Sequence, residues 1–168
     1  TPVTPKTHSK VYWSVCIPKL CYGTEILDVN DNTINNMESF HCGMAKQAQN
    51  LPKQCSNPGS LATLGWKNVR AHCNFLKLIF IWQLLSLNFK CIFKEVCVKR
   101  LCLIIYTDVV RRGPLRNILN VCKEYGLYGY IQYAVESGEY MYKDMWKQIV
   151  KKSVYMLETK RFLIQCKL

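Results

Sequence analysis

The chain has no long hydrophobic run, and it lacks the sequence motifs that are typical of metal and nucleotide sites. Its longest uncharged apolar run, LIFIWQLLSLNF, covers the 12 residues between Lys77 and Lys90, whereas a membrane-spanning helix needs about 20 residues. We therefore expect a buried helix in this stretch. Only three histidines occur, there is no CxxC pair, and the glycines form no phosphate-binding loop.

Paired catalytic carboxylates are also missing. The phrase YTDV at 106–109 superficially resembles a polymerase turn, but Asp108 is followed by Val109, and two-metal phosphoryl transfer needs paired carboxylates to hold both ions. His41–Cys42 and His72–Cys73 are adjacent pairs, whose side chains diverge by about 100° on a helix and rarely share an ion. We predict no enzyme activity, no metal and no cofactor.

The sequence has no Asn-x-Ser/Thr acceptor for N-glycosylation. Its 10 cysteines follow no repeated spacing, and several lie among Ile, Val and Leu, where a free thiol behaves as a small hydrophobic group. A disulfide framework is the alternative. We expect reduced thiols and therefore an intracellular protein, nuclear or cytoplasmic.

Basic residues are what the chain has in excess. Lysine and arginine number 23 against 11 acidic residues, a net charge of +12, and 15 of the basic residues lie in 90–168. Such a surface favours polyanions, either nucleic acid or anionic lipid, although solvated lysines have the same composition. Eight side chains are the candidate nucleic-acid contacts: Lys46, Lys53, Arg111, Arg112, Arg116, Lys143, Lys147 and Lys151.

Apolar periodicity predicts an all-α protein, an irregular bundle of about seven to eight helices with no substantial sheet. Residues 1–10 are expected to be a loose lead-in, and helix and strand compete over 10–22, where Gly23 suits a left-handed stop. A helix capped by Asp31 or Asn32 should bury a stripe of Ile34, Met37, Phe40, Met44 and Ala48. Residues 54–60 are expected to be a turn-rich linker. Further helices are expected over about 60–66, 67–88, 91–106, 114–125, 130–137 and 143–166, with a strand as the alternative for the β-branched end of 91–106.

A series of short phrases resembles the region downstream of the palm in animal non-LTR (LINE-like) retrotransposon reverse transcriptases. The first is Leu20, Tyr22, Gly23 and Glu25, with Leu27 where the family often has an aromatic residue. The later phrases, in order, are 51–53 (LPK), 64–66 (LGW), 77–78 (KL), 100–101 (RL), 113–115 (GPL), 125–127 (YGL), 137–138 (SG), and Trp146-Lys147 with Val150. Each phrase is short, and their order and spacing over about residues 11–165 carry the resemblance.

The resemblance implies that residues 11–105 form a thumb-like helical region that grips template–primer duplex, and that 106–168 form a C-terminal helical tail. The fingers and the palm with its paired aspartates are not in the sequence. The expected function is therefore that of a non-catalytic fragment that binds an RNA–DNA or DNA duplex through phosphates, with the missing fingers and palm of the parent polymerase as natural partners. No zinc knuckle, which some relatives carry, is seen.

Two other functions remain open. The chain is alternatively a helical protein-interaction module or a degenerate element product, which would self-associate through exposed apolar faces. It is alternatively a peripheral membrane protein that uses the last helix, although Asp144 and Glu158 weaken that interpretation.

Overall fold

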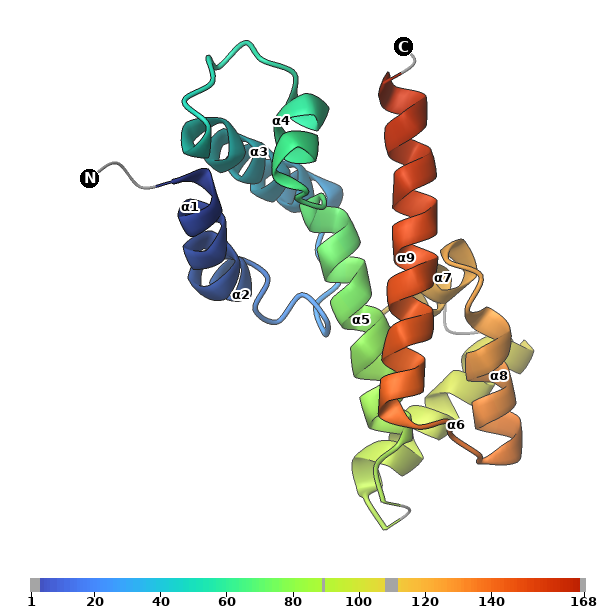
Figure 1. The fold of residues 1–168 in the computed structure, drawn as a ribbon. Coiled ribbons are helices and arrows are strands. Elements are labelled where there is room, and N and C mark those ends of the chain that lie inside the picture. Colours follow the sequence, from blue (N-terminus) through green and yellow to red (C-terminus); the bar gives the residue numbers. More distant parts are fainter. Residues whose placement is uncertain (1–3, 89, 108–111, 167–168) are drawn as a thin grey trace. The chain divides into compact units, whose positions relative to one another are not determined.

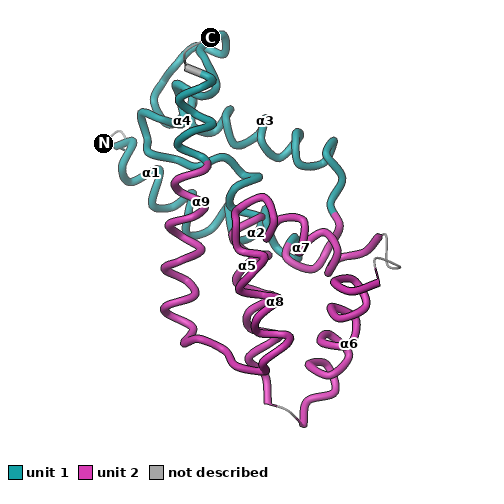
Figure 2. Tube along the Cα trace, turned by 90° about the vertical axis from the view of Figure 1, so that its right-hand side faces the viewer, with its two compact units in different colours: residues 1–24, 29–73, 158–168 teal, residues 25–28, 74–157 magenta. Residues whose placement is uncertain are grey.

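The fold was analysed in a computed structural model that describes residues 4–88, 90–107 and 112–166. Every regular element in these residues is a helix (Figure 1), so the predicted all-α class is confirmed. The chain divides into two compact units: residues 1–24, 29–73 and 158–168 form unit 1, and residues 25–28 and 74–157 form unit 2 (Figure 2). The division falls within α5 and within α9.

Unit 1 begins with a helical stretch in three parts: α1 (Pro5–Val11), a π-helical segment (Tyr12–Cys16) and α2 (Ile17–Leu20). It is followed by α3 (Asp31–Ala48), α4 (Asn57–Leu64) and the first residues of α5 (Val69–Leu85). α1 packs on α3 and α4, and α3 packs on α4. The centre of this unit is aromatic, because Tyr12 stacks on Trp66 with ring centroids 4.6 Å apart.

Unit 2 contains the rest of α5, then α6 (Ile92–Thr107), α7 (Pro114–Glu124), α8 (Tyr128–Ser137) and most of α9 (Lys143–Cys166). α6, α7 and α8 pack on one another. Its core is made of fully buried aliphatic and aromatic side chains: Leu78, Ile81, Leu85, Leu101, Ile118, Leu119, Leu127, Ile131 and Trp146. The uncharged stretch is helical as predicted up to Leu85, with Leu78, Ile81, Trp82 and Leu85 buried, whereas residues 86–88 lie beyond the end of the helix and are exposed.

Two segments expected to be irregular are helical. Residues 5–10, predicted to be a loose lead-in, lie in α1, where the Thr4 hydroxyl accepts a hydrogen bond from the amide of Thr7 and Pro5 occupies the first turn. Proline is well placed there because its missing N–H would have no partner in the first turn. α4 begins in the same way, with the Ser56 side chain as N-cap and Pro58 in the first turn. It therefore starts at Asn57 instead of the predicted Ser60.

The stripe predicted for α3 was wrong at Phe40 and Met44. Phe40 is 51% exposed, whereas the buried residues are Ile34, Met37, His41, Cys42, Ala45 and Ala48. At about 100° per residue, His41 lies roughly 20° from the direction of Ile34, whereas Phe40 lies roughly 120° away. The N-cap is Asn30, not Asp31 or Asn32, since the Asn30 side chain accepts from the amide of Thr33 at 2.8 Å.

The competition between helix and strand over 10–22 is resolved as helix, with a π-helical segment before Pro18. The amide of Ile17 donates to the carbonyl of Tyr12, five residues back. Pro18 has no amide hydrogen to continue the ordinary pattern, so a local widening of the helix is a natural consequence. Gly23 has φ +80°, the left-handed conformation predicted for the residue that stops this helix.

Candidate nucleic-acid interface

Three of the predicted contacts form a row on α9. Lys143, Lys147 and Lys151 are all exposed and are spaced four residues apart, which places them on the same side of the helix. The buried residues Trp146 and Val150 each lie three residues after a lysine of this row, about 60° around the helix from it, so the row borders the buried face. We call these three lysines the lysine ridge. Within the described part of the chain, no carboxylate lies at ion-pair distance from them.

Trp146 fixes the rotation of α9 within unit 2 and thereby the direction in which the ridge points. Its indole Nε1 donates to the carbonyl of Leu78 at 2.9 Å. Its ring stacks on Trp82 with centroids 4.4 Å apart and an interplanar angle of 16°. Trp82 Nε1 in turn donates to the carbonyl of Met141, just before α9. A ridge of flexible side chains is thus mounted on a helix with one well-defined buried face.

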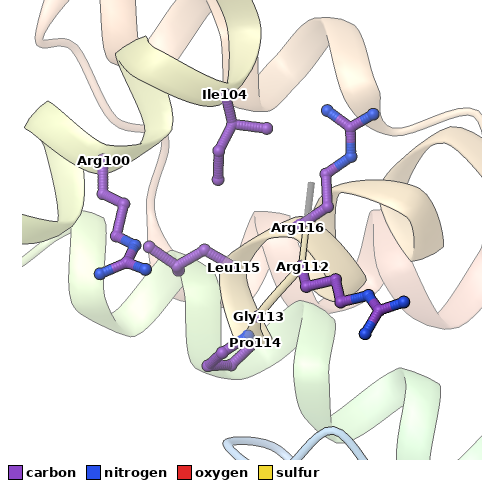
Figure 3. Close-up of a pocket in the computed structure, with 7 residues that line it drawn as sticks. All are labelled: Arg100, Ile104, Arg112, Gly113, Pro114, Leu115 and Arg116. Atoms are coloured by element: carbon purple, nitrogen blue, oxygen red, sulfur yellow. The ribbon is translucent and has the colours of Figure 1, made fainter. Parts of the chain in front are cut away.

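A second basic site lies where α6 approaches the start of α7. Arg100, Arg112 and Arg116 line a hollow of about 170 Å³ together with Ile104, Gly113, Pro114 and Leu115. We call it the arginine hollow. Figure 3 shows Ile104 pointing from α6 toward the start of α7, and the guanidinium groups of Arg112 and Arg116 extending in different directions. Its middle is therefore apolar and its margin carries the positive charge.

The backbone at the hollow adds to this positive field. Gly113 is the N-cap of α7 with φ +122°, Pro114 occupies the first turn, no side chain caps the helix, and no acidic residue lies in the first turn. The N-terminus of a helix carries a partial positive charge from its unpaired amides. Here that charge has the same sign as the arginines around it.

Lys46 and Lys53 are brought together in unit 1. Lys46 Nζ donates to the carbonyl of Lys53 at 2.8 Å, so its ammonium group holds the loop that follows α3. Lys53 itself is exposed. This pair belongs to a different unit from the lysine ridge and the arginine hollow. The remaining predicted contact, Arg111, lies outside the described residues.

Arg100 is the member of the basic surface that sequence reasoning missed. In the sequence, Arg100 is notable only as part of an Arg-Leu phrase. Nothing in the local sequence connects it to the arginines that follow residue 110. Its position on α6, four residues before the buried Ile104, was the available signal. Helix spacing alone could not show that this turn of α6 faces the start of α7.

The histidine–cysteine pairs do not form a metal site in the described residues. His41 Nε2 lies 2.9 Å from the carbonyl of Lys67, and His41 Nδ1 lies 2.9 Å from the Tyr12 hydroxyl, so both ring nitrogens have protein partners. The Sγ atoms of Cys21 and Cys73 are 3.9 Å apart, well beyond the ~2 Å of a disulfide bond. Over the same residues, no group of three or more metal-ligating side chains is close enough to hold an ion.

Comparison with known proteins identifies no relative. No protein family, no curated protein and no solved structure matches the chain. Among the described residues, no helix is both long and apolar enough to span a membrane. A function for this chain must therefore be argued from its own surface chemistry.

Proposed function

We propose that the chain is a non-catalytic helical fragment of a reverse-transcriptase-like protein and that it binds template–primer duplex through phosphate contacts inside the cell, in the nucleus or the cytoplasm. The order of sequence phrases supports the parentage. The observation that carries the binding function is the lysine ridge: three exposed ammonium groups at one spacing, on a helix whose rotation Trp146 fixes. Such contacts supply affinity without sequence choice.

Charge reversal of the ridge tests this proposal. Lys143→Glu, Lys147→Glu and Lys151→Glu together should abolish retention on an RNA–DNA primer–template at physiological salt, because three phosphate contacts become repulsions. The measurement is fluorescence anisotropy with a labelled duplex, and circular dichroism verifies that the helices remain.

A matched control distinguishes the effect of the ridge on duplex binding from the effect of net charge. Lys6→Glu, Lys10→Glu and Lys19→Glu reverse three exposed lysines on α1 and α2 and change the net charge by the same amount. We expect this control to retain most of the duplex affinity. Equal losses in the two triple variants would show that total charge, and not the ridge, determines binding.

A second function, a helical protein-interaction module, is favoured by one specific observation. α6 exposes large apolar side chains along its length: Ile92 (67% exposed), Phe93 (72%), Val96 (56%) and Leu103 (50%). Contiguous exposed apolar surface is typical of protein interfaces. If the chain ignores duplex at low salt and its mass in sedimentation velocity rises with concentration, this second function replaces the first.

A further inference from the structure

The arginine hollow combines two chemistries. Its apolar middle is formed by Ile104, Pro114 and Leu115, and its charged margin by Arg100, Arg112 and Arg116. Its volume of about 170 Å³ equals that of roughly five or six water molecules. This is room for a sugar or another small group, and it is too small for a base pair. Phosphate alone would not need an apolar middle.

From this arrangement we propose that one nucleic-acid strand crosses the arginine hollow, with a sugar against Ile104, Pro114 and Leu115 and the adjoining phosphates on Arg100 and Arg112. This inference rests on the proposed function and names a second contact surface for it, at the place where the end of the thumb-like region meets the tail.

The spread of the charges favours a strand over a single anion, and two further features favour phosphate as the ligand. The guanidinium groups of Arg112 and Arg116 extend in different directions (Figure 3), so the charges lie apart, as the phosphates of a strand do. Arginine presents several donors in a planar fork that matches phosphate oxygens. Finally, the start of α7 has no acidic residue in its first turn, so the helix dipole there attracts negative charge.

The distribution of burial assigns different roles to the arginines. Arg100 and Arg112 are exposed, whereas Arg116 is half-buried. The two exposed side chains are therefore the ones we expect to reach phosphates. Arg116 contributes positive charge at the margin, and the test does not depend on it.

The first test is the salt dependence of duplex binding. For B-DNA, the slope of log affinity against log salt has a magnitude of about 0.9 for each phosphate that the protein neutralises. Arg100→Gln with Arg112→Gln should therefore make the slope shallower by about two. The control is Lys6→Gln with Lys10→Gln, which removes the same charge from the exposed side of α1 and should leave the slope near that of the unaltered chain.

The second test places a charge in the hollow itself. Leu115→Asp and Leu115→Asn remove the same apolar side chain and have nearly the same size, and neither disfavours the first turn of a helix. Only Asp adds a negative charge where the strand should pass. We expect Leu115→Asp to bind duplex at least several-fold more weakly than Leu115→Asn, with both variants equally helical by circular dichroism.

The outcomes distinguish this inference from the proposed function. If the unaltered chain binds duplex and the ridge variant does not, but the double arginine variant keeps the full slope and the two Leu115 variants bind alike, the hollow carries no strand and the inference is overturned while the proposed function stands. If the unaltered chain ignores duplex, both fail. Loss of binding to phosphatidylserine vesicles in the double arginine variant, with duplex binding unchanged, would assign the hollow to lipid headgroups and also overturn the inference.

Discussion

His41 is completely buried in unit 1, between the Tyr12 hydroxyl and the backbone of Lys67. The Lys67 carbonyl can only accept, so Nε2 carries a hydrogen. When the ring is neutral, Nδ1 accepts from the Tyr12 hydroxyl. Burial is the main cause that lowers the pKa of His41, because removal from water disfavours the charged imidazolium. A residue that resembled a metal ligand in sequence is a structural one here.

This burial predicts a loss of stability in acid. Below a pH of about 6.5, the unfolded chain binds a proton at His41 that the folded chain resists. The contribution of His41 to stability is thus present above that pH and is lost as the pH falls toward the lowered pKa of the folded state. Urea unfolding at pH 7.5 and pH 5.5 should show a smaller drop for His41→Gln than for the unaltered chain.

The comparison with the unaltered chain is needed because burial also shifts the pKa of other groups. His72, half-buried against Trp13, has its pKa lowered mainly by burial, and Glu38 has its pKa raised mainly by burial, which acts in the opposite direction. His8→Gln is the control, since the His8 side chain is only half-buried. An unchanged pH dependence in His41→Gln would show that His41 is not the responsible group.

At the scale of elements, the start of α3 gives a sharp test. The Asn30 side chain caps the helix through the amide of Thr33, whereas Asn32 lies inside the first turn and is exposed. Asn30→Ala should cost about 1 kcal/mol of unfolding free energy. Asn32→Ala should be neutral or slightly stabilising, because alanine has the higher helix propensity. Equal effects in urea unfolding would contradict the observed cap.

The attachment of α9 within unit 2 predicts a much larger effect. Trp146 is 1% exposed, stacks on Trp82 and donates to the carbonyl of Leu78. Trp146→Ala should therefore cost about 3–5 kcal/mol. Tyr142, which precedes the helix, is 82% exposed, and Tyr142→Ala should change the unfolding free energy by less than about 0.5 kcal/mol. A small effect at Trp146 in urea unfolding would mean that α9 is held elsewhere.

Sequence periodicity was most informative for elements with a single buried face. The last helix was predicted over 143–166 and lies there, because Trp146 and Val150 alternate regularly with lysines. α4 and α1 were misjudged because Pro, Ser and Asn are typical of both turns and helix starts. The π-helical segment depends on how a chain accommodates Pro18 locally, which periodicity does not show.

At the scale of the whole molecule, the two parts of the basic surface differ in how far they could be predicted. The lysine ridge depends only on the spacing of three lysines within one helix, so it could be predicted from the sequence. The arginine hollow depends on α6 and the start of α7 coming together, and Arg100 was therefore missed. The unit division within α5 and α9 likewise has no signal in composition, since both are continuous helices.

The most direct test of duplex binding is fluorescence anisotropy of the full chain with a labelled RNA–DNA primer–template, titrated from low to physiological salt. We predict micromolar or tighter affinity at low salt and a log–log salt slope of several units, because each phosphate contact releases counterions. A flat titration, with duplex ignored even at low salt, would contradict the account.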